Sequence, residues 1–281
     1  MKDRQIPGFL YVFLSAVLFS IGGICIKMVP WNAMSINSAR NLISATMIGI
    51  YMRAARHRIV INPAVLFGAL CTTATTTLYV LANKMTTAAN TIVLQFTAPV
   101  FVVLFSWLFF RKKPRKLDMI TIVFVLIGIV FFFVDGLSTG STLGNMLALV
   151  SGVTYAGVFM MNSFSHSDSL SSIFLGQCIS AVMGFPFLLQ ETDFGFQAVL
   201  GILLLGIFQV GLAYILLSKG LKSTSAVTAS LTSAIEPILN PILVAIFWHE
   251  YITPTALIGA GIVIVSIIVY NALKAKRQGN G

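Results

Sequence analysis

A single acidic residue, Glu236, lies in the middle of an apolar stretch, within a series of polar residues. These recur at every fourth position: Thr228, Thr232, Glu236 and Asn240. On a helix they form one polar stripe. An acid at the centre of a membrane-spanning helix costs roughly 2.5 to 3.5 kcal/mol and needs a partner or water. Glu236 is therefore a candidate to bind a cationic or zwitterionic group or to carry a proton. The alternative is structural: it hydrogen-bonds a neighbouring span or pairs with Arg40.

Arg40 is the one basic residue well inside an apolar stretch, where it stands beside Asn37 and Asn41. The long stem of an arginine lets its guanidinium reach toward the membrane surface. We therefore expect Arg40 to be a structural anchor that pairs with backbone carbonyls or with Glu236, rather than a ligand of a substrate.

Aromatic residues with a polar tip occupy interior positions of three further stretches: Tyr79, Tyr155 and Tyr214. Phe19 takes the place that corresponds to Tyr155 in an internal repeat described below. A pocket walled by such rings and a carboxylate suits an aromatic side chain or an alkylammonium group, through stacking and cation-π attraction. Taken alone, each tyrosine is explained better by helix packing or by the membrane interface.

Several amides lie at interior positions of the apolar stretches: Gln95, Asn162, Gln177 and Gln209. Each can bind the polar groups of a ligand or hold neighbouring helices together. Gln95 lies on a face that corresponds to the stripe around Glu236, but Ala98 takes the place of the acid there. We expect Gln95, Thr232 and Asn240 to position the polar groups of a bound molecule, with Asn162 as a further candidate.

Two prolines, Pro99 and Pro237, lie in the middle of long apolar stretches at equivalent places. Proline removes one backbone hydrogen bond and clashes with the preceding turn, so it bends a helix and frees a carbonyl. Such breaks are either structural kinks or parts of a binding site that let the helices bend as a carrier changes its access.

The elements that must position these residues are apolar stretches of about twenty residues each. The chain is 57% hydrophobic and 9% charged, with a mean hydropathy of +0.94, which excludes an ordinary soluble domain. Stretches such as Ile120 to Val134 are apolar on every side, unlike the alternating strands of a membrane barrel. We predict an all-α polytopic membrane protein with ten transmembrane helices, at 8–28, 34–53, 64–84, 88–110, 117–134, 143–164, 171–189, 198–219, 225–248 and 254–274.

The distribution of basic residues follows a membrane topology. If the chain begins in the cytoplasm, the 18 Lys and Arg residues fall on cytoplasmic segments, with the exceptions of Lys27, Lys84 and Arg40. This bias predicts a protein of the cytoplasmic membrane with both termini in the cytoplasm. It also accounts for the net charge of +10 without nucleic acid as a partner.

The second half of the chain resembles a diverged copy of the first half. A shift of 138 residues places Pro99 on Pro237, and a shift of 136 residues places Phe19 on Tyr155. An odd number of spans in each copy makes the copies lie in opposite orientations across the membrane. We expect one membrane domain over 1–281, with five-helix repeats over 8–134 and 143–274.

Several function classes lack support in the sequence. Cys25, Cys71 and Cys178 lie in separate apolar stretches without metal-ligand spacing, so we expect neither a metal nor another cofactor. No phosphate-binding loop or metal-hydrolase motif is present, and no nucleophile and base stand together, so we expect a protein that is not an enzyme. A channel would ordinarily show a pore loop or a ring of charges rather than one acid.

Taken together, the ten spans, the five-plus-five repeat and the Glu236-Pro237 pair resemble the EamA group of the drug/metabolite transporter superfamily. In that group the first span commonly ends with a basic residue, as at Lys27, and the second span carries an arginine, as at Arg40. Its ninth span reads Glu-Pro followed by an apolar run and a closing acid, which matches Glu250 here.

The first half departs from the pattern of this group. Ala98-Pro99 stands where many members repeat Glu-Pro, Lys112 replaces a closing acid, and Phe19 replaces a tryptophan. The two halves are therefore not expected to contribute equivalent charges.

The resemblance implies a secondary carrier with a central cavity between the halves and alternating access. The substrate it implies is an amino acid or related small metabolite, often exported. Among these we favour an aromatic or otherwise zwitterionic amino acid, with choline-like or other organic cations as the alternative and proton coupling through Glu236 as a possibility. The lipid bilayer is the remaining partner.

Overall fold

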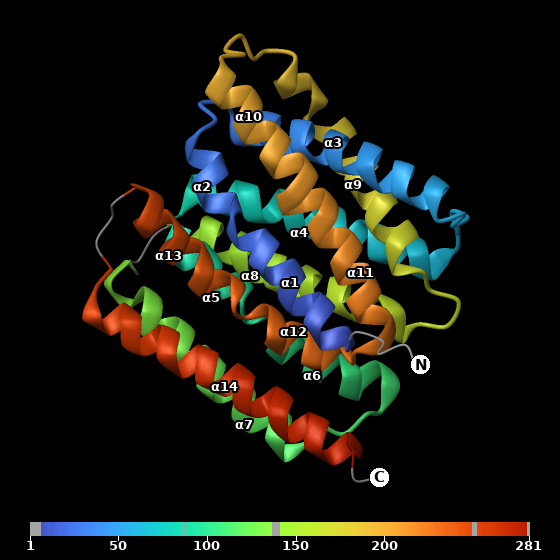
Figure 1. Ribbon diagram of the computed structural model, residues 1–281, viewed down its shortest axis with the longest axis vertical. Coiled ribbons are helices and arrows are strands. Elements are labelled where there is room, and N and C mark those ends of the chain that lie inside the picture. Colours follow the sequence, from blue (N-terminus) through green and yellow to red (C-terminus); the bar gives the residue numbers. More distant parts are fainter. Residues whose placement is uncertain (1–6, 87, 137–140, 249–251, 280–281) are drawn as a thin grey trace, which may run out of the picture.

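The computed structural model describes residues 7–86, 88–136, 141–248 and 252–279, and all regular structure in this part of the chain is helical (Figure 1). The first half contains seven α-helices and a closing 3-10 turn, in this order: α1 (Gly8–Ser20), α2 (Gly22–Lys27), α3 (Ala33–Ala54), α4 (Pro63–Met85), α5 (Ala88–Gln95), α6 (Ala98–Phe110), α7 (Lys116–Phe133) and η1 (Val134–Gly136).

The second half repeats this plan with two differences: its first span is one continuous helix, and its third span is interrupted by a π-helical segment. Its elements are α8 (Thr142–Met160), the 3-10 turn η2 (Met161–Ser163), α9 (Ser169–Leu188), α10 (Phe196–Leu204), the π-helical segment η3 (Leu205–Leu212), α11 (Ala213–Ser223), α12 (Ala226–Ser233), α13 (Glu236–Trp248) and α14 (Pro254–Gly279).

Nine stretches of the described residues are long and apolar enough to cross a membrane. Helix α3 has 22 residues, which is also long enough, but it is too polar to be recognised by hydropathy. Its middle carries Asn37, Arg40 and Asn41, all buried. With α3 as the tenth span, the predicted all-helical fold of two repeats is confirmed.

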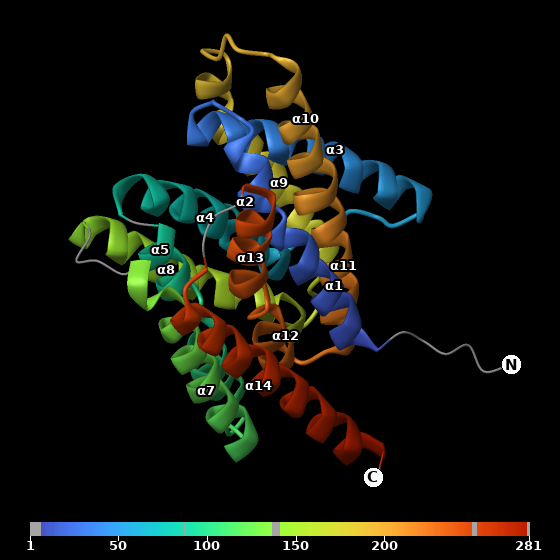
Figure 2. The same ribbon diagram turned by 60° about the vertical axis from the view of Figure 1, so that its left-hand side comes forward.

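Helices from the two halves pack in pairs. The main pairs are α3 with α9, α7 with α14, α4 with α8 and α1 with α11. Figures 1 and 2 show α7 and α14 side by side at one edge of the bundle. There a Cβ on Gly259 would lie 2.5 Å from the carbonyl oxygen of Gly128, so only glycine permits this approach. Exchanging the halves converts the pair α1–α11 into the pair α8–α4, as two interlocked repeats require.

The spans that contain Pro99 and Pro237 are both broken just before that proline. Two residues, Phe96 and Thr97, separate α5 from α6, and Ala234 and Ile235 separate α12 from α13. Each break moves the proline into the first turn of a new helix, where its missing N–H is no loss. The kinks predicted for these spans are therefore present as complete interruptions.

Two further irregularities were not predicted. Ile21 separates α1 from α2, and the eighth span contains the eight-residue π-helical segment η3. Segments of this kind are rare and frequently occur at functional sites. Neither contains proline, so the sequence offered no local signal for them.

Candidate functional site: a polar cavity and a buried acid

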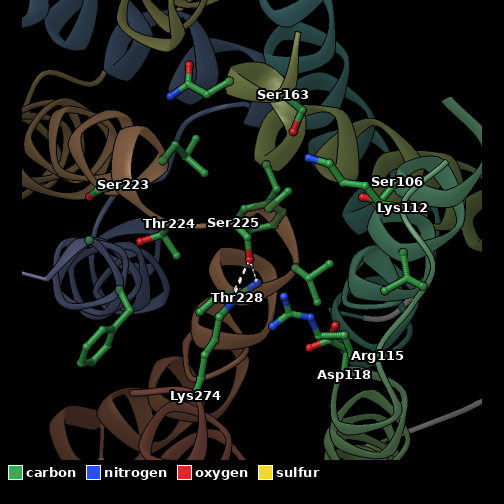
Figure 3. A pocket seen from close by; sticks show the side chains of 18 of the residues that line it. Ser106, Lys112, Arg115, Asp118, Ser163, Ser223, Thr224, Ser225, Thr228 and Lys274 are labelled. Atoms are coloured by element: carbon green, nitrogen blue, oxygen red, sulfur yellow. Dashed lines mark hydrogen bonds between the residues drawn. The ribbon is translucent and has the colours of Figure 1, made fainter. Parts of the chain in front are cut away.

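A cavity of about 1220 Å³ opens at the end of the bundle where α1 begins and α14 ends. Figure 1 shows this end of the bundle, and Figure 3 shows residues that line the cavity. We call this end the basic end, because five cationic side chains line the cavity there: Lys112, Lys113, Arg115, Lys222 and Lys274. Among the described residues that line it, Asp118 is the only acid.

A hydrogen-bonded network crosses one wall of this cavity. Lys274 points toward the start of α12, where its ammonium donates to Ser225 over 3.0 Å and also to Thr228 (Figure 3). The hydroxyl of Tyr270 donates to Asp118 over 2.9 Å. The network therefore connects α7, α12 and α14 through charged groups that are partly exposed to the cavity.

Asn162, one of the predicted ligands, also lines this cavity from the turn after α8. Its side-chain nitrogen is buried and has no hydrogen-bond partner among the described residues. It lies apart from Glu236, which is not among the residues that line the cavity.

Glu236 lies beside the cavity, behind two aromatic rings. Its carboxylate accepts a hydrogen bond of 3.3 Å from the hydroxyl of Tyr155. The ring of Tyr155 packs on Phe159 at 4.6 Å between centroids and on Phe96 at 6.1 Å. Phe159 lines the cavity, so a chain of contacts leads from the cavity through Phe159 and Tyr155 to the half-buried acid.

The other predicted aromatic residues surround the same acid. Tyr214 packs edge-on against Phe19, with ring centroids 4.9 Å apart, and it interacts electrostatically with Glu236. Tyr155 interacts in the same way with Tyr214 and with Tyr79. The fold thus gathers the predicted aromatic residues of spans one, three, six and eight around the acid of span nine.

Arg40 lies at the edge of this group. It is 8% exposed, donates a hydrogen bond of 2.9 Å to Asn37, and interacts electrostatically with Tyr214 and Tyr79. Within the part of the chain that the structure describes, no hydrogen bond or ion pair joins Arg40 to Glu236. The sequence-based expectation that the two residues pair therefore finds no support in the structure.

The broken helices bring free carbonyls to the same region. Because proline lacks an N–H, the carbonyl of Gln95 loses its helical partner at Pro99, and that of Ser233 loses its partner at Pro237. The amide of Gln95 donates to Ser151 over 2.7 Å. The predicted ligand Gln95 thus holds the first break against α8.

The predicted polar stripe of span nine is divided by the second break. Thr232, before the break, accepts a hydrogen bond of 3.3 Å from Asn271 of α14, whereas Glu236, after the break, contacts Tyr155 of α8. Asn240 follows Glu236 by one turn of α13 and is half-buried. Thr232 and Glu236 thus bond to different helices, and Asn240 shares a face of α13 with Glu236 by its spacing of four residues.

The end of the bundle opposite the cavity is held by contacts between the two halves. The indole of Trp31 donates to the carbonyl of Asp193 over 2.5 Å, and the backbone of Asn32 donates to Glu191 over 2.8 Å. Thr253 donates to Asp135 over 2.7 Å. Glu250, which the family pattern singles out, lies outside the described residues.

Sequence reasoning did not single out Phe96, Phe159, Ser151 or Lys274. The two phenylalanines are typical of any apolar stretch, and Ser151 gains its role only from the approach of Gln95. Lys274 was considered only as one of the basic residues that indicate the membrane topology. A possible signal for Phe159 was its spacing of four from Tyr155, which places both rings on one helix face.

The EamA-like transporter family model matches this chain twice, over residues 6–134 and 142–272. The chain belongs to this family. The two matches coincide with the two halves of the fold and confirm the predicted resemblance.

Curated relatives agree with this assignment. The transporter YwfM of Bacillus subtilis (strain 168) is 26% identical over 286 residues, which cover 96% of this chain and 95% of the relative. A transporter of Clostridium kluyveri is 25% identical, with 95% and 94% covered. Solute carrier family 35 member G1 of Homo sapiens is 28% identical over 52% of this chain and 41% of its own length. A solved crystal structure of 17% identity has a TM-score of 0.82 and covers 95% of this chain and 97% of its own, which supports the fold.

Proposed function

We propose that this EamA family member is a secondary transporter that exports amino acids or related zwitterionic metabolites across the cytoplasmic membrane. The observation that carries the proposal is Glu236, a half-buried carboxylate among Tyr155, Tyr214 and Phe19, next to a cavity that is open at one end. A carboxylate attracts an ammonium group, and the rings suit an apolar or aromatic side chain.

The basic end is proposed to face the cytoplasm, together with both chain termini. The cations around the cavity lie where the positive-inside rule places such residues. A cavity open at the basic end, with the halves joined at the opposite end, fits one state of an alternating-access cycle. A substrate entering from the cytoplasm would be loaded for export.

Choline-like and other organic cations remain the alternative substrates that Glu236 accommodates. The charge of the cavity argues against them, because five cations and one acid line the approach. A field of this sign repels a molecule with net positive charge and admits one whose charges balance. We therefore place zwitterions first.

The proposal is tested by counterflow in proteoliposomes preloaded with unlabelled L-phenylalanine, L-leucine or choline. We expect saturable accumulation of the labelled amino acid and none of choline. Glu236→Gln should reduce this rate at least about tenfold, since it removes the charge that pairs with ammonium. Asp193→Asn is the matched control and should transport normally, because Asp193 is exposed at the opposite end and its carboxylate accepts only a local hydrogen bond from Gly195. Counterflow of choline without that of any amino acid would overturn the choice of substrate, and flux that rises linearly without exchange would indicate a pore.

A further inference from the structure

Helix α3 carries buried polar atoms that have no hydrogen-bond partner among the described residues. They lie in successive turns: Ser35 Oγ, Asn37 Nδ2, Arg40 Nε, Asn41 Oδ1 and Ser44 Oγ. All but Arg40 are completely inaccessible, and Arg40 is 8% exposed. Buried polar groups of folded proteins are nearly always paired. A run of unpaired ones along one helix therefore points to a polar ligand or to water.

Helix α9 faces this run with a further unpaired group. Ser38 of α3 donates to the carbonyl of Ala181 over 2.7 Å, and Gly49 lies against Phe174. Gln177 falls between these two contacts and is level with the middle of α3. It has no exposed surface, and neither its Nε2 nor its Oε1 has a hydrogen-bond partner among the described residues. Polar atoms from both packed helices are thus unsatisfied at the same depth.

The internal repeat relates these two groups. Gln177 follows Arg40 by 137 residues, between the shifts of 136 and 138 that relate the spans on either side. The first half therefore places a cation where the second half has a neutral amide. In spans four and nine it is the second half that carries the charge, because the acid Glu236 corresponds to Ala98 of the first half. Each half thus contributes one charge that the other half lacks at the equivalent position, and the two charges are of opposite sign.

Both charges act on the same tyrosine. Tyr214 interacts electrostatically with Arg40 and with Glu236, while Arg40 and Glu236 do not bond each other within the described chain. An arginine that is buried without a carboxylate partner is costly. A guanidinium and a carboxylate that both lie near Tyr214, without bonding each other, would suit a molecule that carries an ammonium and a carboxylate on one carbon.

We propose that Arg40 binds the carboxylate of the substrate, with Asn37, Asn41 and Gln177 as neighbouring hydrogen-bonding groups, while Glu236 binds its ammonium. This deepens the proposed function and rests on it. The guanidinium of an arginine presents N–H donors in a fixed fork that suits a carboxylate. The assignment differs from the anchoring role expected for Arg40 from sequence, since its Nε has no hydrogen-bond partner among the described residues.

The test compares an amino acid with its methyl ester, which keeps the side chain and the ammonium but loses the carboxylate charge. Thermal shifts of the purified protein are titrated with L-phenylalanine and its methyl ester, and with L-leucine and its methyl ester. On the unaltered protein we expect the acid to bind at least about tenfold more tightly than the ester, the scale of one charge-assisted hydrogen bond.

Arg40→Gln should weaken binding of the acid at least about tenfold and leave the ester unchanged, so that the preference disappears. Glu236→Gln should weaken both ligands. Arg53→Gln, an exposed position on the same helix, is the matched control and should bind both ligands like the unaltered protein. Arg40→Lys keeps the positive charge but loses the forked N–H donors of the guanidinium. Its affinity for the acid should lie between those of the unaltered protein and Arg40→Gln.

The possible outcomes distinguish a failure of this inference from a failure of the proposed function on which it rests. If neither the acids nor the esters stabilise the unaltered protein, the proposed amino-acid substrate fails. If the acids bind but no better than the esters, or if Arg40→Gln keeps the preference, Arg40 is surrounded by water only and this inference is wrong. Should Arg40→Gln fail to fold, the comparison of acid and ester on the unaltered protein still tests the inference, because equal affinities would show that the carboxylate is not bound.

Discussion

The two broken spans, α5–α6 and α12–α13, are equal in backbone and unequal in chemistry. Each is interrupted two residues before a proline, and each places that proline in the first turn of the following helix. At the first break the amide of Gln95 is bound to Ser151, and Ala98 begins the next helix. At the second break Glu236 begins the helix and faces Tyr155. The duplicated backbone gives both spans the same break, and the difference between Ala98 and Glu236 places a charge at only one of them.

The largest effect is expected from moving the acid between the breaks. Glu236→Ala should abolish transport, and the double variant Ala98→Glu/Glu236→Ala should not restore it. Ala98 is 1% exposed, so an acid there would be buried without the hydroxyl that Tyr155 offers to Glu236. Counterflow rates measure this, with size-exclusion profiles to show that the variants fold. Restored transport would mean that the two breaks are interchangeable.

A smaller effect is expected where the first break packs on α8. A Cβ on Gly152 would lie 2.8 Å from the carbonyl oxygen of Gln95 and 3.0 Å from that of Leu94. Gly152→Ala should therefore destabilise the protein by about 1 to 3 kcal/mol through overpacking. Gly261→Ala on α14 is the matched control, because nothing lies within 4 Å of its Cβ position. Equal melting temperatures for the two variants would contradict the close packing of the break.

Replacing Pro237 should reduce transport more than replacing Pro99, because only the break at Pro237 positions a charge. Replacing either by alanine permits the missing helical hydrogen bond. In Pro237→Ala a continuous helix would turn Glu236 toward the side of Thr232 and away from Tyr155, so we expect transport to fall about tenfold. In Pro99→Ala no charged group moves, and we expect a change of about twofold.

Pro186→Ala in α9 is the control for both proline variants, because Pro186 lies inside a helix that continues without a break. Initial rates of counterflow provide the measurement. A larger loss in Pro99→Ala than in Pro237→Ala would indicate that the breaks serve bending alone, and not the position of the acid.

The smallest effect concerns the residues that begin the equivalent helices α3 and α9. Asn32 caps α3 by accepting from Met34, and Asp168 caps α9 by accepting from Ser171 over 2.8 Å. Asp168 also lies 2.8 Å from His57. Burial alone raises the pKa of Asp168, but the hydrogen bonds from Ser171 and His57 outweigh it and lower this pKa below its ordinary value of 3.8.

A carboxyl with a lowered pKa stabilises the fold above its unfolded pKa and loses that contribution as the pH falls through its folded pKa. Asp168→Asn should therefore lower the melting temperature slightly at neutral pH, and the difference should fade below about pH 3.8. Melting curves at a series of pH values measure this. If the difference in melting temperature between Asp168→Asn and the unaltered protein grows on acidification, the lowered pKa of Asp168 is contradicted.

Much of the architecture follows from local pattern. The apolar runs, the positions of Pro99 and Pro237 and the nearly constant offset between the halves are enough to predict ten helices in two inverted repeats. The grouping of Glu236 with Tyr155, Tyr214 and Phe19 was also predicted. A carboxylate inside the membrane almost always faces the interior of the bundle, where the side chains of the neighbouring spans meet it.

Other features depend on contacts that no local pattern encodes. A period of four joins Thr232 to Glu236 only while the helix is continuous, and the break turns them toward different neighbours. The cavity at the basic end exists because side chains from several helices leave space between them. The sequence by itself determined which residues carry charge into the membrane, since hydropathy and duplication are properties of the chain. Only the tertiary structure decided which of them meet, because that depends on helix rotation, breaks and packing between the halves.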